Sequence, residues 1–225
     1  MNILLICLAV VGGYILGSIS TAVWAGKLFH GIDVREHGSG NAGATNVIRV
    51  LGWKTGIPVM LIDVAKGWLA ALLPVLLNLA DKGSNTLISI QILTGAAAIL
   101  GHLFPIFTGF RGGKGVGTTV GILLALQPLL TLSCLVVFLT VFIITGIVSV
   151  SSMSFGLAFP LFLFTLFPTP SMVFRIFSIF IAVALIVTHR ENIGRLLRGE
   201  EKKLFGKKKT EPSDSTNNQN VNIKI

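Results

Sequence analysis

Long apolar runs separated by short polar segments make up most of this chain. A helix needs about 20 apolar residues to cross a bilayer, with a range of about 17 to 25. Runs of that kind occupy residues 3–24, 56–79 and 86–107, and a longer one covers residues 116–150. Two shorter runs, residues 153–167 and 172–188, flank the turn Pro168-Thr169-Pro170. The pattern predicts transmembrane helices along most of the chain.

The longest run, residues 116–150, exceeds what a single crossing needs. Pro128 divides it after Gln127, because proline has no amide to donate inside a helix. The prediction is an all-α polytopic membrane protein, a bundle of seven transmembrane helices. The alternative is five, with the two short segments re-entrant or merged. Residues 1–205 form the membrane domain, and residues 206–225 are expected to be a disordered polar and basic tail.

Composition and charge add an orientation to this picture. Hydrophobic residues make up 52% of the chain, charged residues 12%, and mean hydropathy is +0.83. The 18 basic residues outnumber the 9 acidic ones and gather in residues 25–54, in residues 108–115 and beyond residue 189. The positive-inside rule then places the N-terminus outside and the C-terminus in the cytoplasm, with all three glycine-bearing polar segments on the cytoplasmic face. Membrane lipids, not nucleic acid, are the expected partners of this charge.

The first polar segment, residues 38–49, combines glycines with small polar residues and ends in Arg49. Such a backbone can point N–H groups into a concave anion-binding nest, and Arg49 adds bidentate geometry for phosphate. The alternative is a plain Gly/Asn turn, but the stretch is longer than a turn needs. The residues expected to bind substrate phosphate here are Gly40, Asn41, Gly43, Thr45, Asn46 and Arg49.

The second polar segment, residues 109–119, resembles a phosphate loop that opens a helix. It is not a Walker A sequence, since Thr108 stands where glycine is required and Gly115 replaces Ser or Thr after Lys114. Nucleotide hydrolysis is therefore excluded. Positive-inside charge combined with glycine packing is an equally good explanation of this loop taken alone. Its expected phosphate-binding residues are Gly112, Gly113, Lys114 and Gly115.

The third polar segment, residues 189–200, follows the last apolar run. His189 and Asn192 lie three apart, so they share one face of a helix. A basic helix on the membrane surface is the alternative, and it is the better explanation of Arg195 and Arg198. Neither His189 nor Asn192 is needed for lipid adhesion, which favours a functional role for both.

Two ionisable residues interrupt the second apolar run. Asp63 and Lys66 have the spacing of an i,i+3 ion pair, although they could also shape the floor of a site. His102 is better explained as a core histidine than as a catalytic one. The four histidines and two cysteines show no zinc-ligand spacing, so no metal is expected.

Together these segments resemble the acyl-phosphate:glycerol-3-phosphate acyltransferase family of the PlsY type. The resemblance spans nearly the whole chain except the tail. It rests on Gly17-Ser18-Ile19, Lys27, GSGNAGATNVIR at residues 38–49, DVAKG at 63–67, GHLFPIF at 101–107, FRGGKGV at 110–116 and HRENIGRLLRGEE at 189–201.

The resemblance implies a cytoplasm-facing enzyme of the bacterial inner membrane that uses no cofactor. Such an enzyme transfers a fatty acyl group from acyl phosphate, not acyl-CoA, to the 1-hydroxyl of sn-glycerol 3-phosphate. The product is lysophosphatidic acid, and the step is the first committed one of phospholipid synthesis. It also implies seven transmembrane helices and functional coupling to a cytosolic enzyme that produces acyl phosphate.

The residue types suit that reaction. Acyl phosphate is already activated, so the enzyme must mainly bring two substrates together. Arg49 and Lys114 would neutralise phosphates, Ser39 and Asn192 would position substrate, and His189 is the conventional general-base candidate. A substrate phosphate is the alternative proton acceptor. Residues expected to shape the site are Lys27, Asp63, Lys66, His102 and Glu191.

Two other functions share some of these features. A transporter for a phosphorylated or anionic solute would have the helices and the basic loops, but it would need polar residues at the bilayer midplane. Only Asp63 and Lys66 are candidates there. A lipid-binding scaffold would not need Ser39, His189 or Asn192.

Overall fold

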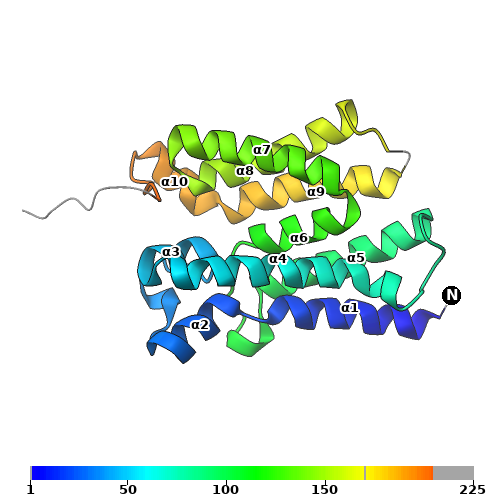
Figure 1. Cartoon of the computed structure of the whole chain (residues 1–225), viewed down its shortest axis with the longest axis horizontal. Helices are drawn as coiled ribbons and strands as arrows, with labels where there is room; N and C mark the ends of the chain where they lie inside the picture. Colours follow the sequence, from blue (N-terminus) through cyan, green and yellow to red (C-terminus); the bar gives the residue numbers. More distant parts are fainter. Residues whose placement is uncertain (1, 170, 205–225) are drawn as a thin grey trace, which may run out of the picture.

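The computed structural model describes residues 2–169 and 171–204, and every regular element in these ranges is a helix. The longer helices run along the long axis of the molecule (Figure 1). They are α1 (Ile3–Ser18), α4 (Trp53–Leu76), α5 (Asn85–Leu103), α6 (Val116–Leu126), α7 (Pro128–Thr145), α8 (Val148–Thr165) and α9 (Met172–Thr188). Shorter elements lie between or after them: α2 (Thr21–His30), α3 (Ala44–Leu51), α10 (Arg190–Leu197) and the 3₁₀ turns η1 (Val34–Glu36) and η2 (Ile106–Thr108).

The apolar helices confirm an all-α polytopic membrane protein. By length and composition, four helices within the described ranges can cross a bilayer, and six if the bent pairs α1–α2 and α9–α10 each count as one span. The bend is 41° in the first pair and 56° in the second, and α6 is a shorter apolar helix. Each of the seven predicted runs therefore forms helix, although the predicted limits differ from the observed ones.

The predicted break at Gln127 and Pro128 is confirmed, because α6 ends at Leu126 and α7 begins at Pro128. Two other limits were wrong. The first run bends at Ile19 and Ser20 instead of continuing to residue 24, and the next helix after α7 begins at Val148 instead of residue 153. Gly146 ends α7 in the left-handed conformation, with φ 70°, which a glycine adopts without steric cost.

Small residues allow the helices to pack closely. Gly13 and Gly17 of α1 lie against the backbone of α5, and a Cβ at Gly17 would clash with the carbonyl of Ala98. Gly67 of α4 and Gly121 of α6 make the same kind of approach to one another's helix. Helix association in lipid depends on such close van der Waals contact, since lipid tails provide no hydrophobic driving force between helices.

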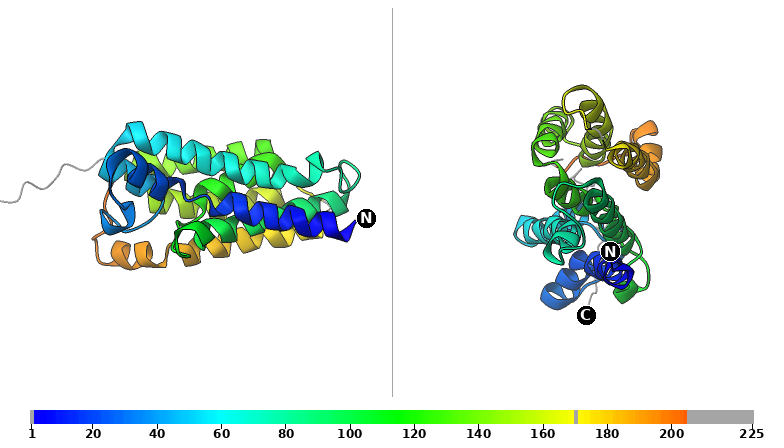
Figure 2. Two further views of the ribbon diagram at one scale, coloured as in Figure 1. Left: turned by 90° about the horizontal axis from the view of Figure 1, so that it is seen from below. Right: turned by 90° about the vertical axis from the view of Figure 1, so that its right-hand side faces the viewer.

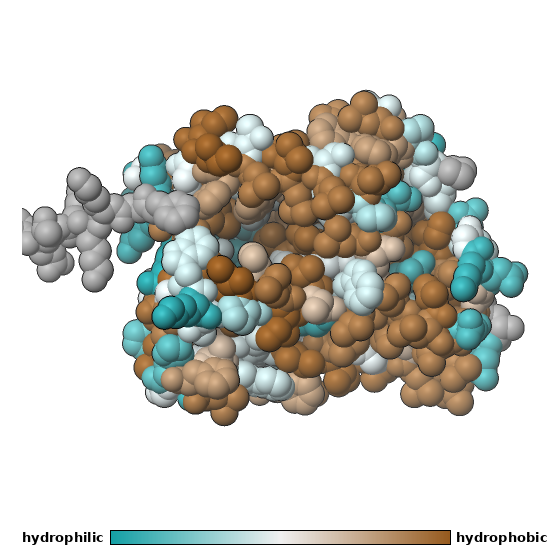
Figure 3. Space-filling view, in the orientation of Figure 1, coloured by the Kyte–Doolittle hydropathy of each residue, from teal (hydrophilic) through white to brown (hydrophobic). Residues whose placement is uncertain are grey.

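The helices form two groups, and α6 lies between them (Figures 1 and 2). One group contains α1, α4 and α5, and the other contains α7, α8 and α9. A buried cluster that includes Ile122 and Leu123 of α6 and Phe155 and Phe159 of α8 joins the two groups. Hydrophobic residues cover the middle of the visible face and hydrophilic ones gather at its two ends (Figure 3), as expected for a bilayer-spanning bundle.

The three polar segments meet at one end of the bundle, as the charge pattern predicted. Helices α2, α3 and α10 lie at this end, and the beginning of α1 lies at the other (Figures 1 and 2). Side-chain hydrogen bonds connect the segments across more than 70 residues of sequence, including Arg35 to Thr108 and Lys114 to Asn192. The predicted disordered tail, residues 206–225, lies outside the described residues.

Candidate active site

A cavity of about 560 Å³ opens at the polar end of the bundle and extends between the two helix groups. Part of the hollow is visible between α4 and α7 in Figure 3. Its polar end is lined by Ser39, Asn41, Thr45, Asn46, Arg49, Asp63, His102, Lys114, Ser149, His189, Asn192 and Glu201. Its apolar part is lined by Met60, Val64, Val120, Leu124, Leu135, Phe138, Leu139, Phe142 and Phe155. One cavity thus offers a charged region and a hydrocarbon-like region to the same ligand.

Ser39 is fixed by Asn46. The Oδ1 atom of Asn46 accepts hydrogen bonds from the amide of Ser39 at 2.8 Å and from its hydroxyl at 3.1 Å. The Nδ2 group of Asn46 donates to the carbonyls of Val34 and His37 at 2.7 and 3.0 Å. Asn46 is only 1% exposed, so its amide is used mainly to hold this loop around Ser39.

Arg49 reaches the cavity from the last turn of α3. Its Nη2 donates to the carbonyl of Lys202 at 2.9 Å, and its Nε is a buried donor without a hydrogen-bond partner among the residues that the structure describes. Burial lowers the pKa of Arg49, with Glu201 opposing and Arg195 reinforcing that shift. A buried, unsatisfied guanidinium donor beside a cavity is suited to an anionic ligand.

The glycines of the second segment have two different roles. The amide of Gly112 donates to the carbonyl of Leu103 and that of Gly113 to the carbonyl of His102, both at 3.1 Å. These two glycines do not line the cavity, whereas Lys114 and Gly115 do. A side chain at Gly113 would overlap the His102 ring, so the loop needs glycine for packing as much as for anion binding.

Lys114, Asn192 and Glu201 form a connected polar group. The ammonium of Lys114 donates to Oδ1 of Asn192, and Nδ2 of Asn192 donates to Oε1 of Glu201 at 2.6 Å. Glu201 also accepts from Ser149 at 2.8 Å and from Nε of Arg195 at 2.7 Å. The carboxylate of Glu201 therefore joins α8, α10 and the segment after α10.

Charge in this region is predominantly positive. Burial lowers the pKa of Lys114 to about 8, and the nearby Arg195 contributes to the shift. Burial raises the pKa of Glu201, but hydrogen bonds from Asn192, Arg195 and Ser149 outweigh it and lower the pKa overall. The three cations Arg49, Lys114 and Arg195 thus outnumber the two nearby carboxylates, Glu201 and Glu191, which leaves positive charge available to bind anions.

His189 caps the end of α9, and its side chain is buried at the cavity wall. Its Nδ1 lies 2.7 Å from the carbonyl of Leu185. Burial lowers the pKa of His189 to about 4, so the ring is neutral near pH 7. A carbonyl oxygen only accepts hydrogen bonds, so Nδ1 carries the one ring proton and Nε2 keeps its lone pair. The ring is therefore held in the tautomer that can accept a proton or a hydroxyl hydrogen bond through Nε2.

A buried network forms the cavity floor. Lys66 and Asp63 make the i,i+3 ion pair at 2.8 Å, and Lys66 also donates to the carbonyl of Ile19 at 2.9 Å. That carbonyl lies where α1 ends and α2 begins, so Lys66 stabilises the bend. Nδ1 of His102 lies 3.2 Å from the hydroxyl of Thr118 and 3.7 Å from Asp63. Asp63 and His102 line the cavity, while Lys66 lies behind them.

Some of the remaining predicted residues line the cavity, and others do not. The first segment contributes Asn41, Gly43 and Thr45 to the lining, whereas the amide of Gly40 is used by the carbonyl of His37. Lys27 is exposed and pairs with Asp33 at 3.3 Å. The lining residues do not include Lys27 or Glu191.

Sequence reasoning missed Glu201 and Ser149. Glu201 closes the third motif, but nothing in the sequence distinguished it from the adjacent Glu200, whose side chain is 56% exposed against 3% for Glu201. Ser149 lies in a region predicted to be plain transmembrane helix. Its hydroxyl donates a hydrogen bond to Glu201, a residue 52 positions later in the chain. Arg195, which the sequence assigned to the membrane surface, instead pairs with Glu201.

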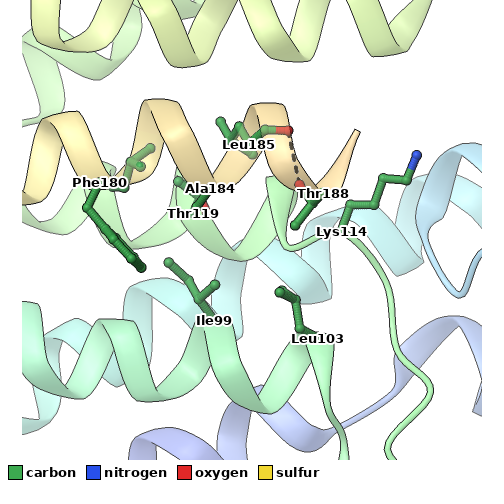
Figure 4. A pocket seen from close by; sticks show the side chains of 9 residues that line it. Ile99, Leu103, Lys114, Thr119, Phe180, Ala184, Leu185 and Thr188 are labelled. Carbon is green, nitrogen blue, oxygen red and sulfur yellow. Dashed lines mark hydrogen bonds between the residues drawn. The ribbon is translucent and has the colours of Figure 1, made fainter. Parts of the chain in front are cut away.

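A second, much smaller pocket of about 20 Å³ lies between α5, α6 and α9. Figure 4 shows Ile99, Leu103, Phe180 and Ala184 around it, with the amine of Lys114 pointing away. That volume holds about one water-sized probe, so this pocket is a packing space and not a substrate site.

Comparison with known proteins supports a specific assignment. A match to the family described as "Glycerol-3-phosphate acyltransferase" covers residues 7–199. The chain is 43% identical to the glycerol-3-phosphate acyltransferase of Chlorobaculum tepidum, with 88% of this chain and 97% of that protein covered. It is 44% identical to glycerol-3-phosphate acyltransferase 2 of Bacillus anthracis, with 91% and 100% covered.

Solved structures agree with these sequence matches. The chain superposes with a TM-score of 0.79, at 39% identity, on the crystal structure of PlsY (YgiH), an integral membrane glycerol 3-phosphate acyltransferase, in its glycerol 3-phosphate form. The alignment covers 89% of this chain and 96% of that one. The lysophosphatidic acid form gives a TM-score of 0.74 at 37% identity. This chain therefore belongs to the glycerol-3-phosphate acyltransferase family.

Proposed function

We propose that this protein acylates glycerol 3-phosphate in the synthesis of phospholipids. The observation that carries the proposal is the two-part cavity, in which Arg49 and Lys114 lie at one end and apolar residues of α6, α7 and α8 at the other. Lysophosphatidic acid has a phosphate at one end and a fatty chain at the other, so it matches both parts. The family membership and the substrate and product named for the related structures support the same reaction.

The acyl donor is acyl phosphate, and the acceptor atom is the 1-hydroxyl. Both substrates then carry a phosphate, which accounts for two cationic side chains, Arg49 at the end of α3 and Lys114 in the loop before α6. An acyl phosphate has the reactivity of a mixed anhydride, so the enzyme needs proximity and charge neutralisation more than a covalent intermediate. The fatty chain enters the apolar part of the cavity from the surrounding lipid.

Transfer forms a new ester bond while the acyl–phosphate bond breaks. The 1-hydroxyl oxygen attacks the acyl carbon, its proton passes to His189 Nε2 or to the donor phosphate, and inorganic phosphate leaves. Ser39 orients the attacking hydroxyl, because Asn46 fixes its position at the cavity rim. Asn192 holds Lys114 near the substrate phosphate until the anion replaces that contact. Loop amides other than those of Gly40, Gly112 and Gly113, which donate to protein carbonyls, stabilise the charge that develops on the acyl oxygen.

The protein spans a bacterial inner membrane seven times, with the N-terminus outside and the site in the cytoplasmic leaflet. In this arrangement α6 is a crossing that is shorter than the others, and it is buried between the two helix groups. The concentration of basic residues at the end that contains the cavity supports this orientation. The water-soluble acceptor then arrives from the cytoplasm, and a cytosolic enzyme supplies acyl phosphate to the membrane.

The test is an acyl-transfer assay with purified protein in nanodiscs. Labelled glycerol 3-phosphate is incubated with palmitoyl phosphate or, separately, with palmitoyl-CoA. The proposal expects labelled lysophosphatidic acid and an equal amount of inorganic phosphate from palmitoyl phosphate, and no product from palmitoyl-CoA. Uptake of the label into proteoliposomes without lysophosphatidic acid would identify a transporter instead, and product from palmitoyl-CoA alone would contradict the assigned donor.

A further inference from the structure

Arg35 connects the two polar loops without being part of the cavity wall. Its Nη1 donates to the carbonyl of Thr108 at 2.7 Å and to the carbonyl of Arg111 at 3.1 Å. Both carbonyls belong to the turn that leads directly into Lys114. Arg35 is not among the residues that line the cavity, and its side chain is 21% exposed. Its contacts are therefore with the backbone of the opposite loop, not with a substrate.

Asp33 fixes the guanidinium group of Arg35. Nε and Nη2 of Arg35 donate to the two oxygens of Asp33 at 3.0 and 2.7 Å, and the Arg35 amide also donates to Asp33 at 3.0 Å. Lys27 adds a third cationic contact to this carboxylate at 3.3 Å. These hydrogen bonds hold the pKa of Asp33 well below its usual range, so the carboxylate stays charged. A bidentate pair of this kind has one geometry, which makes it a rigid support.

The backbone around Arg35 is connected to Ser39 through the side chain of Asn46. Arg35 lies in η1 between Val34 and His37, the two residues whose carbonyls accept from Asn46. Asn46 in turn holds the amide and hydroxyl of Ser39. Ser39 is thus connected to the loop of Lys114 through the hydrogen bonds of Asn46, the backbone of η1 and the side chain of Arg35.

The Lys114 loop is anchored from its other side by α5. The amides of Gly112 and Gly113 donate to carbonyls at the end of α5. Without Arg35, this loop would remain attached to α5 but would lose its side-chain hydrogen bonds to the segment that carries Ser39. Movement of one loop relative to the other is the expected consequence.

We propose that Arg35, clamped by Asp33, is a positioning residue that sets the separation between Ser39 and Lys114. The proposal rests on the proposed acyl transfer, in which Ser39 orients the acceptor hydroxyl and Lys114 holds a phosphate. Arg35 then controls alignment of the reacting groups, whereas Arg49 and Lys114 control affinity. A displacement of about 1 Å at reacting groups can lower a rate by about 100-fold, so alignment is the property most sensitive to such a change.

Steady-state kinetics of Arg35→Lys and Asp33→Asn test this role. Lysine keeps the charge but cannot reproduce the two-oxygen pairing with Asp33 together with the two carbonyl contacts. For Arg35→Lys we expect kcat to fall about tenfold or more with KM for glycerol 3-phosphate changed by less than about threefold, because the phosphate-binding cations remain. Asp33→Asn should show the same pattern with a smaller loss. A large rise in KM with unchanged kcat, or no change in either constant, would overturn the proposal.

Arg198 provides the matched control. It forms a comparable ion pair with Glu200 at 2.7 Å, but both side chains are exposed and neither lines the cavity. Arg198→Lys should keep wild-type kcat and KM. If wild type and Arg198→Lys produce no lysophosphatidic acid at all, the proposed function fails; if they produce it and Arg35→Lys is equally active, only the positioning role fails.

Chemical rescue provides a second, independent measurement. Arg35→Ala leaves a gap that a free guanidinium ion can fill between Asp33 and the two carbonyls. Addition of guanidinium chloride at millimolar concentration should restore part of the lost kcat in Arg35→Ala, while an equal concentration of sodium chloride should not. Equal responses to both salts would contradict a specific guanidinium role. If Arg35→Ala fails to fold, the kinetic pattern of Arg35→Lys and Asp33→Asn decides the matter.

Discussion

The side-chain carbonyl of Asn46 accepts hydrogen bonds from both the amide and the hydroxyl of Ser39. This pairing converts a glycine-rich loop, which would otherwise be flexible, into a fixed support for one hydroxyl group. Gly38 and Gly40 on either side have φ of 66° and 71°, conformations that favour glycine. Ser39 therefore owes its position to a residue seven places away on α3.

Replacement of Asn46 by Ala should reduce both turnover and stability. The carbonyls of Val34 and His37 lose their buried donor, which costs about 1–3 kcal/mol of unfolding free energy. Thermal unfolding in detergent and initial rates measure the two effects.

Ser39→Ala should lower kcat by about 10- to 100-fold with little loss of stability, because it removes a hydroxyl at the cavity rim. Near-normal turnover of Ser39→Ala would remove this residue from the reaction.

The affinity for glycerol 3-phosphate should weaken in alkaline solution. Only protonated Lys114 binds phosphate strongly, and its pKa is lowered to about 8. The substrate phosphate is already doubly charged in this range, since its second pKa is about 6. KM should therefore be level between about pH 6 and pH 8 and rise about tenfold per pH unit above pH 8. Lys114→Ala should raise KM at neutral pH and abolish the further rise; an identical pH profile for wild type and Lys114→Ala would contradict this role.

Glu201→Gln should lower both stability and turnover, although the two side chains have nearly the same shape. Glu201 accepts hydrogen bonds from Ser149, Asn192 and Arg195, and a glutamine cannot satisfy three donors with one carbonyl oxygen. We expect a loss of about 1–3 kcal/mol in unfolding free energy and reduced turnover. The exposed neighbour gives the control: Glu200→Gln should behave as wild type. Equal unfolding free energies and turnover for Glu201→Gln and Glu200→Gln would show that the hydrogen bonds of Glu201 do not stabilise the site.

A larger side chain in the apolar part of the cavity should change acyl-chain preference. Leu135 of α7 lines the cavity, whereas Leu132 of the same helix is exposed outside the lining. Leu135→Trp should lower kcat/KM for palmitoyl phosphate by about tenfold relative to a shorter donor such as lauroyl phosphate, because the cavity loses volume. Leu132→Trp should leave the ratio unchanged. A ratio that is equal in both variants would place the fatty chain elsewhere.

Much of the architecture follows from hydropathy alone. The seven apolar runs all form helix, and Pro128 begins α7 as its sequence position predicted. The bend at Ile19 could not be predicted, because a distant residue stabilises it: Lys66 of α4 donates to the Ile19 carbonyl. The residues around Ile19 give no indication of this contact, because Lys66 lies 47 residues further along the chain.

Some features of the candidate site could also be predicted from the sequence, and others could not. Motif residues such as Arg49, Lys114, His189 and Asn192 line one cavity, which residue type and charge pattern indicated. The sequence did not indicate which acceptor each loop amide binds. Gly112 and Gly113 were predicted to bind phosphate, but their amides donate to carbonyls of α5. Glu201 was missed because its importance depends on tertiary contacts to α8 and α10, and a sequence that reads Glu200-Glu201 gives both residues the same appearance.

In the proposed reaction, one cavity holds both the phosphate and the fatty chain of the acyl donor. Photo-cross-linking tests it most directly, with a palmitoyl phosphonate that cannot transfer its acyl group and carries a diazirine at the end of its chain. In nanodiscs we expect cross-links to cavity residues such as Leu124, Leu135 and Phe138, and excess palmitoyl phosphate should suppress them. Cross-links found only on lipid-facing residues outside the cavity, and not reduced by the competitor, would rule this arrangement out.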